Sequence, residues 1–224
     1  VVVNNGICLN RFDPSAAYPD IRSELGISQD CILISYIARI TSQKDPITLL
    51  NAFKKVLASI KNIRLLMIGD GDLKEKAVAH AQAIGISKEV IFQSFRQDVP
   101  ALLHASDIYC LPSLWEGLPI GLLEAMAMKN VVIATEVDGS KEIITNEDNG
   151  LLVPVQQPEL LANAIIKICN NDILRKKLQD NARKTVVEKY NVVRVTTQIE
   201  SVYGCINSPV QPVVYAQREL RIMK

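Results

Sequence analysis

Two acidic residues, Glu116 and Glu124, stand out in the stretch SLWEGLPIGLLEAMAMKN, which is otherwise rich in apolar residues. The helical pattern over residues 119–129 is apolar almost all round, and Glu124 is its only charge before Lys129. Such a pattern is typical of a buried helix, where an ionised carboxylate without a partner is costly. We therefore expect Glu124 to bind a ligand or to reach an opening. The alternative is that Glu116 caps the helix and Glu124 faces solvent.

The residues around the expected start of this helix could bind an anion. Pro119 suits the first helical turn, because its φ is preset and it lacks a donor that would go unpaired there. The amides near Gly117, Leu118, Ile120 and Gly121 would then face a phosphate, with the helix dipole behind them and glycine leaving room for close approach. One acid at the mouth and one deeper suit the hydroxyls at both ends of a nucleotide sugar.

Two cations, Arg39 and Lys44, lie in the stretch ARITSQKDP, directly after an apolar run. Asp45 and Pro46 behind them indicate a helix start, so the cations belong to a strand-to-helix loop. The arginine fork can take two oxygens of a pyrophosphate, and lysine can act as a point charge. The alternative is that both are ordinary solvated charges of the surface.

A glycine-rich stretch, IGDGDLKEKA, is similar to a dinucleotide fingerprint but does not complete it. Gly69 and Gly71 fit G-x-G, whereas Lys74 stands where a third glycine should pack the helix against the strand. Asp70 and Asp72 would also place negative charge where a phosphate ought to lie. We expect a tight turn with Asp72 as the N-cap of the next helix, and we disfavour a dehydrogenase.

Strand and helix patterns alternate along the chain. The apolar strand candidates are residues 31–38, 63–69, 90–93, 107–112, 131–135 and the short run 149–154. The helix candidates are residues 45–60, 73–84, 98–105, 119–129, 157–170, 172–189 and 193–204. This order predicts an α/β fold with a doubly wound parallel sheet, in which ligands bind outside the carboxyl ends of the strands. We expect one Rossmann-like domain over residues 1–206 and a tail over residues 207–224.

Composition narrows the class of protein. The chain has 224 residues, 48% hydrophobic residues and a formal net charge of +1, which does not indicate a nucleic-acid partner. Five cysteines without a C-x-x-C motif indicate reduced thiols in a cytosolic protein, and two isolated histidines argue against a metal site. No signal peptide or membrane-spanning run is seen, and the start at Val1 suggests that the chain was cut from a longer protein.

These motifs together resemble the donor-binding domain of family 4 retaining glycosyltransferases, which have the GT-B fold. The resemblance covers about residues 1–206 and rests above all on the E-x7-E pair with its upstream R-x4-K pair. It implies that Arg39 and Lys44 bind the diphosphate and stabilise the leaving group. It further implies that Glu116 contacts hydroxyls of the donor sugar, as a third catalytic residue, and that Glu124 binds the ribose.

The resemblance also implies further donor-binding positions. Phe95 and Arg96 lie where the family binds the nucleobase, and Gly6 belongs to the Asn-Gly run near the start of the chain. The phosphate-contacting loop corresponds to Gly117, Leu118, Ile120 and Gly121. Some positions differ from the commonest pattern of the family, namely Asn4, Ala38, Pro119 and Asp138.

The function that the resemblance implies is transfer of a hexose, with retention, from a UDP, GDP or ADP sugar to a sugar, lipid or polysaccharide acceptor. It implies no cofactor and no metal. It also implies an amino-terminal acceptor-binding domain that this chain lacks, so the domain alone is expected to be inactive. The alternatives are a non-catalytic nucleotide-sugar-binding module, a degenerate pseudoenzyme and a nucleotide-sugar epimerase of the same fold. We expect a cytoplasmic protein without a transmembrane segment; a peripheral position at the inner face of a membrane is the variant for the full-length protein.

Overall fold

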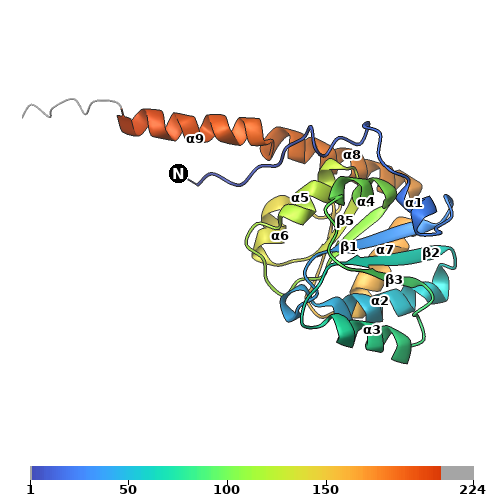
Figure 1. Cartoon of the computed structure of the whole chain (residues 1–224). Coiled ribbons are helices and arrows are strands. Elements are labelled where there is room, and N and C mark those ends of the chain that lie inside the picture. The colour runs from blue at the N-terminus through green and yellow to red at the C-terminus, as the bar shows by residue number, and fades with distance from the viewer. Residues whose placement is uncertain (1, 208–224) are drawn as a thin grey trace, which may run out of the picture.

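The computed structural model describes residues 2–207 and has one parallel sheet at its centre (Figure 1). The strands run in the order β3-β2-β1-β4-β5-β6, and every neighbouring pair is parallel. Their bounds are β1 Ile32–Ile37, β2 Ile63–Ile68, β3 Val90–Gln93, β4 Ile108–Leu111, β5 Val131–Thr135 and β6 Leu151–Val153. The predicted doubly wound α/β sheet is confirmed, and each expected strand is found.

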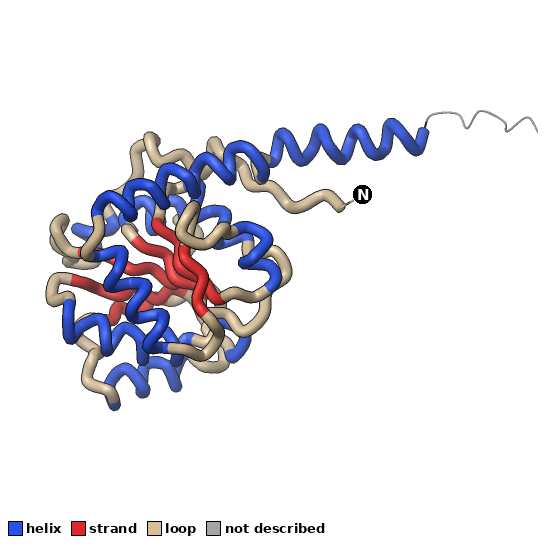
Figure 2. Tube along the Cα trace, turned by 180° about the vertical axis from the view of Figure 1, so that it is seen from behind, coloured by secondary structure: helices blue, strands red, loops and turns tan. Residues whose placement is uncertain are grey.

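Helices cover both faces of the sheet. Their bounds are α1 Ile21–Glu24, α2 Pro46–Ser59, α3 Lys74–Ala83, α4 Val99–Ala105, α5 Ile120–Ala127, α6 Asp138–Ile143, α7 Pro158–Cys169, α8 Asp172–Lys189 and α9 Val192–Asn207. Helices α2, α3 and α7 pack into one hydrophobic cluster with the sheet, whereas α1, α4 and α5 pack on the opposite face (Figure 1). Figure 2 shows the same layers from behind.

Burial on both faces explains why the strand sequences are continuous apolar runs. All five residues of β5 and all four residues of β4 are buried. A parallel sheet covered by helices has no solvated face, so its strands carry no polar alternation. The consequence is that polar and charged side chains gather in the loops at the strand ends.

Several local expectations are wrong. Pro119 is the N-cap of α5 in an extended conformation, with ψ 97°, so the helix begins one residue later, at Ile120. The N-cap of α3 is Leu73, without a capping side chain, and Asp72 lies in the preceding turn. That turn is fixed by backbone proximity instead, since a Cβ on Gly69 would lie 2.0 Å from the carbonyl oxygen of Ala38. The sequence patterns also missed α1 and α6, which are too short to show helical periodicity.

The last described helix, α9, extends away from the sheet and its covering helices (Figure 1, Figure 2). The amino-terminal segment runs beside its beginning, where Ile7 forms a parallel bridge with Asn191. Helix α9 contains the helix expected over residues 193–204. Residues 208–224 of the expected tail lie outside the described residues, as does Val1. Among residues 2–207, none of the helices combines enough length with enough hydropathy to cross a bilayer.

Candidate functional site

The strand order places two of the predicted motifs side by side. Strands β1 and β4 are neighbours at the centre of the sheet, where the order of strands reverses. The loop after β1 carries Arg39 and Lys44, and the loop after β4 carries Glu116. Ligands of open α/β sheets bind at such a reversal, outside the carboxyl ends of the strands. The candidate site is therefore the crevice between these two loops.

Lys44 and Glu116 form an ion pair across this crevice. The distance from Lys44 Nζ to Glu116 Oε1 is 2.5 Å, and the two side chains are only 16% and 7% exposed. The sequence predicted both residues as site residues, but their direct contact was not predicted. The carboxylate of Glu116 is the counter-charge of Lys44.

The neighbouring Gln43 joins the same two loops, and sequence reasoning missed it. Its side-chain Nε2 donates to the carbonyl oxygen of Trp115 at 3.0 Å. Its own carbonyl oxygen accepts from the amide of Leu114 at 2.8 Å. The loop that carries Glu116 is thus held by three bonds to the segment that carries Lys44. No pattern in the sequence indicates these contacts, because they join residues that are far apart along the chain.

Gly139 fixes the other side of the Glu116 loop. A Cβ on Gly139 would lie 1.7 Å from the carbonyl oxygen of Gly117 and 3.0 Å from that of Glu116. Only a glycine in the first turn of α6 lets this helix approach the loop so closely. Gly139 therefore has a packing role at the candidate site.

The backbone amides predicted to bind a phosphate have no hydrogen-bond acceptor among the described residues. Within residues 2–207, the backbone N–H groups of Gly117, Leu118, Ile120 and Gly121 donate no hydrogen bond. A helix N-terminus with free amides attracts anions. The two glycines differ, however: a Cβ on Gly117 would meet open space, whereas one on Gly121 would lie 2.7 Å from the hydroxyl of Tyr109. The Gly121 position is thus already explained by packing on Tyr109.

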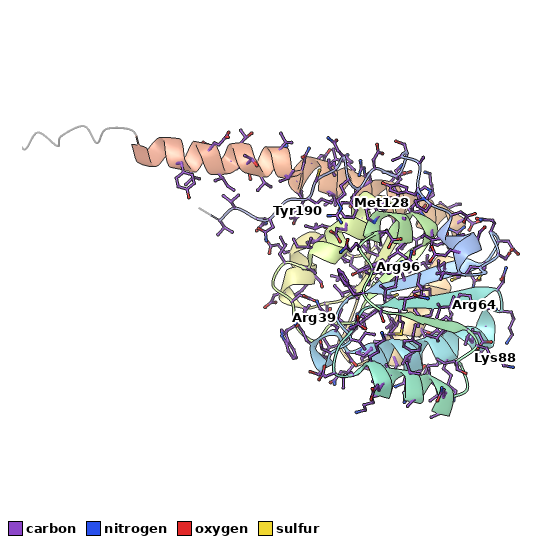
Figure 3. The ribbon with its side chains drawn as sticks, in the orientation of Figure 1. Arg39, Arg64, Lys88, Arg96, Met128 and Tyr190 are labelled. Carbon is purple, nitrogen blue, oxygen red and sulfur yellow. The ribbon has the colours of Figure 1, made fainter. Side chains whose placement is uncertain are left out.

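Arg39 is the unpaired cation of the site. Its side chain is exposed and makes no hydrogen bond or ion pair with the other described residues; only its backbone carbonyl oxygen accepts hydrogen bonds. Figure 3 shows Arg39 at the end of the sheet where the chain leaves β1. Arg39 can therefore meet an incoming anion without giving up an internal partner.

An apolar cavity of about 210 Å³ lies beside Arg39, at the ends of β1, β2 and β3. Phe95 and Arg96, the two residues predicted near the nucleobase, both line it together with Ile37, Ile68 and Val99. Phe95 is 70% exposed, which leaves its ring available to a flat ligand. The cavity lies next to the diphosphate candidates, as a nucleoside pocket requires.

The guanidinium of Arg96 is not free to bind a base. It contacts Glu24 Oε1 at 2.5 Å and Asp98 Oδ2 at 2.6 Å, and these contacts hold the pKa of both carboxyls below their usual range. Arg96 therefore lines the cavity with its charge already paired.

Glu124 is a partly buried carboxylate without a hydrogen bond or ion pair among the described residues. Burial raises the pKa of its carboxyl, and the positive charge of Arg11 offsets part of that rise. Glu124 is partly buried, which disfavours the alternative that it merely faces solvent. Arg11 was not singled out from the sequence, because its distance along the chain gives no hint that it approaches α5.

Gly6, the remaining site residue predicted from the sequence, packs against the start of α9. A Cβ at this position would lie 2.7 Å from the Cα of Val192, so close packing on α9 explains why a glycine stands there. In the described part of the chain, no cluster of histidine, cysteine or acidic side chains has a metal-binding arrangement. The described cysteines Cys8, Cys31, Cys110 and Cys169 are free thiols.

Comparisons with known proteins agree with this architecture. A galactosyltransferase of Escherichia coli, UDP-Gal:alpha-D-GlcNAc-diphosphoundecaprenol alpha-1,3-galactosyltransferase, is 27% identical over 206 residues, or 90% of this chain and 53% of that protein. The crystal structure of a glycosyltransferase from Rickettsia africae has a TM-score of 0.84 at 26% identity, covering 93% of this chain and 58% of that one. Anabaena Alr3699/HepE in complex with UDP-glucose has a TM-score of 0.83 at 22% identity, covering 92% and 57%.

The chain spans about half the length of the curated relatives it matches. The family described as glycosyl transferases group 1 matches residues 18–185, which include both loops of the crevice and all of the sheet. This chain belongs to the glycosyl transferases group 1 family.

Proposed function

We propose that this chain is the donor-binding half of a retaining glycosyltransferase that transfers a hexose from a nucleotide diphosphate sugar. The observation that carries the proposal is the convergence, at the reversal of the strand order, of Arg39, Lys44 and the free amides at the start of α5. Two cations and a helix N-terminus suit a diphosphate between a nucleoside and a sugar.

The proposed chemistry needs only groups of the chain itself. As the sugar leaves, negative charge grows on the diphosphate, and Arg39, Lys44 and the amides near Gly117 and Ile120 would stabilise it. The role proposed for these groups is electrostatic, so the reaction proposed here is metal-independent. Glu124 would accept hydrogen bonds from the ribose hydroxyls, and Glu116 from the hydroxyls of the hexose.

Uridine is the nucleoside that we propose for the donor. The E. coli relative is named for UDP-Gal, and the cavity of about 210 Å³ beside Phe95 is small and mainly apolar. Arg96 is paired with Glu24 and Asp98, and Asp70 with Lys74, so among the described residues that line the cavity only Arg39 keeps an unpaired charge, and it is proposed for the diphosphate. GDP and ADP sugars are the competing donors.

The acceptor half of the reaction is proposed to lie in another part of the full-length protein. The family relatives are about twice as long as this chain, which is consistent with an amino-terminal domain that binds the acceptor and closes over the donor. A sugar, lipid or polysaccharide acceptor and a cytoplasmic location, with the inner face of a membrane as a variant, belong to the same proposal.

A thermal-shift panel tests the donor. The chain is heated with UDP, GDP and ADP and with the glucose conjugate of each, because a ligand that binds only the folded state raises the melting temperature. UDP and UDP-glucose are expected to give the largest rise. A larger rise of the melting temperature with GDP or ADP would mean that the donor carries guanosine or adenosine instead of uridine. No rise with any of the six ligands would contradict the proposed function.

A further inference from the structure

The amino-terminal segment, residues 2–20, is attached to helices beside the crevice. The side-chain Nδ2 of Asn4 donates to Glu142 Oε1 of α6 at 2.7 Å. The amide of Ile7 donates to the carbonyl oxygen of Tyr190, just before α9, at 2.8 Å. Figure 1 shows the segment running beside the beginning of α9 before it reaches α1. The function proposed above uses no residue of this segment.

The turn at residues 8–12 of this segment docks on α5. Phe12 is 2% exposed and belongs to the same hydrophobic cluster as the buried residues of α5. Arg183 of α8 donates from Nη1 to the carbonyl oxygen of Phe12 at 2.7 Å and to that of Ala127 at 2.8 Å. One guanidinium thus joins the turn to the end of α5, so the position of the turn relative to α5 is fixed.

Arg11 is the charged residue of that turn, and its charge is free. Its Cζ lies 5.4 Å from the centroid of the Phe12 ring, a distance at which a guanidinium is attracted to the ring face. The side chain is exposed, and its guanidinium makes no hydrogen bond or ion pair with the other described residues. Asp13, the nearest acid along the chain, accepts hydrogen bonds from Ser15 instead. The buried Phe12 therefore holds Arg11 in place while its charge stays available.

The charge of Arg11 acts on Glu124 of α5. Burial raises the pKa of the Glu124 carboxyl, and the positive charge of Arg11 opposes that rise. Tyr109 of β4 interacts with the same carboxylate, but its hydroxyl donates to the carbonyl oxygen of Ile37 at 3.3 Å. Burial and the charge of Glu124 raise the pKa of Tyr109, so this phenol stays neutral. Arg11 is thus a counter-charge of Glu124 that does not bond to it.

The other titratable groups on elements around α5 have partners elsewhere. Arg183 of α8 is bonded to two carbonyl oxygens, and Lys129 pairs with Asp180 Oδ1 at 3.2 Å. The ring of His104 on α4 lies 5.0 Å from that of Tyr18. Strand β5 has the sequence VVIAT and carries no titratable side chain. Arg11 is therefore the group to change in a test of how Glu124 is kept charged.

A cation that lies near an acid without bonding to it has a specific consequence. A partly buried carboxyl favours its neutral form, whereas hydroxyl groups donate more strongly to a carboxylate. A cation in direct contact would occupy the carboxylate oxygens, as Lys44 does with Glu116. A cation at a distance favours the charged form and leaves the oxygens open. This arrangement suits an acid that has to accept hydrogen bonds from a ligand.

We propose that Arg11 is a positioning residue of the donor site, which keeps the Glu124 carboxylate charged and open to the ribose without binding the ligand itself. The inference rests on the proposed function, because it takes Glu124 to accept hydrogen bonds from the ribose hydroxyls. It adds the amino-terminal segment to the parts of the chain that determine donor affinity.

The experiment uses the chain of residues 1–224 and separates the charge of Arg11 from its bulk. Arg11→Met keeps a long side chain without the charge, and Arg11→Lys keeps the charge. Arg194→Met is the matched control, because Arg194 is exposed on α9 and makes no side-chain hydrogen bond or ion pair with the other described residues. Melting curves establish that each variant is folded.

Calorimetric titration with UDP and with 2′,3′-dideoxyuridine diphosphate measures the contribution of the ribose hydroxyls. Both ligands carry the same diphosphate, so the titration of that group cancels. The UDP affinity of Arg11→Met should fall below that of the wild type as the pH is lowered from about 7, and should be about threefold weaker near pH 5. Arg11→Lys should recover most of this loss, and about 0.5 M salt should reduce it. The dideoxy analogue should bind the wild type and Arg11→Met equally.

A double-variant cycle tests whether Arg11 acts through Glu124. In the Glu124→Gln background, Arg11→Met should cause no further loss of UDP affinity, because the carboxylate that it acts on is gone. A loss that persists in this background, or with the dideoxy analogue, would mean that Arg11 binds the ligand directly, which overturns the positioning role.

The remaining outcomes separate this inference from the proposed function. UDP binding by the wild type, with the same affinity in Arg11→Met across the pH range, would overturn the role of Arg11 alone. An equal loss in Arg194→Met would mean that the effect is not local to Glu124 and would overturn it as well. Failure of the wild type to bind UDP would remove the proposed function and this inference with it.

Discussion

At the scale of single residues, replacing Arg39 and replacing Lys44 should weaken ligand binding to a similar extent but should affect the free energy of unfolding differently. Replacing either by alanine should weaken UDP binding by about 1–3 kcal/mol, because each change removes a charged hydrogen-bond donor. The Arg39 side chain has no partner among the described residues, so its loss should leave the free energy of unfolding unchanged. Lys44→Ala strands the carboxylate of Glu116, whose side chain is 7% exposed, and should lower that free energy by about 3 kcal/mol.

Calorimetric titration and urea unfolding measure the two effects. The double variant Lys44→Ala with Glu116→Gln is the control, and it should recover part of the lost stability because no charge remains stranded. Unchanged UDP affinity in both single variants would mean that the cations are ordinary surface charges.

The two acids should divide the donor between them. Glu124→Gln should weaken binding of UDP itself by about 1–3 kcal/mol, since it removes a charged partner proposed for the ribose. Glu116→Gln should leave UDP affinity equal or somewhat higher, because Lys44 loses the carboxylate that competes with the diphosphate. The gain from an attached sugar should fall only in Glu116→Gln. Titration of both variants with UDP and UDP-glucose checks this, and equal losses for both ligands in both variants would contradict it.

Glu124 should also make stability depend on pH. Burial raises the pKa of its carboxyl above the unfolded value, so the folded state holds the proton more tightly. Stability from this group is therefore present below the unfolded pKa and is lost as pH rises through the folded pKa. Glu124→Gln does not titrate, so its free energy of unfolding relative to the wild type should increase from about pH 4 to about pH 7. Urea unfolding across this pH range tests the prediction. If the free energy of unfolding of Glu124→Gln falls relative to that of the wild type as pH rises, the carboxylate has a structural role.

At the scale of elements, the loop that carries Glu116 is held between the Ser42–Lys44 turn and the first turn of α6. Gly139→Ala should displace this loop, because the new Cβ would lie 1.7 Å from the carbonyl oxygen of Gly117. We expect the free energy of unfolding to fall by about 1–3 kcal/mol, as for other overpacked sites, and UDP-glucose binding to weaken.

Gly204→Ala in α9 is the matched control for that change. A Cβ there would meet nothing within 4 Å, and alanine is favoured over glycine in a helix by about 1 kcal/mol. Thermal unfolding of both variants should therefore move in opposite directions. Similar melting temperatures would show that the α6 contact is not tight in solution.

At the scale of the whole molecule, we expect the chain to bind the donor without turning it over. The chain spans about half of its curated relatives, so groups that position an acceptor and exclude water are proposed to lie elsewhere. The chain alone is expected to bind UDP-glucose weakly and to release almost no UDP. A coupled assay of UDP release, with and without the remainder of the full-length protein, measures this. Efficient transfer by residues 1–224 alone would contradict the prediction.

Local order along the chain was predictable because it depends on neighbouring residues. The apolar runs that became β1 to β6 predicted a parallel sheet, since only strands buried on both faces lack polar alternation. The E-x7-E and R-x4-K spacings likewise pointed to the loops where Glu116 and Arg39 lie. The short helices α1 and α6 were not predictable, because four and six residues are too few to show a helical period; α1 is marked only by its N-cap Asp20, and the N-cap of α3 has no capping side chain.

Only the tertiary structure decided which predicted residues meet. The order β3-β2-β1-β4-β5-β6 places the loop after β1 beside the loop after β4, and neither strand sequence states which neighbour it will pair with. That pairing produced the contact between Lys44 and Glu116, the Gln43 bonds and the approach of Gly139. The sequence by itself determined the elements and the charges that the loops carry. Contacts between distant residues arise from the packing of whole elements, which is why they became visible only in the fold.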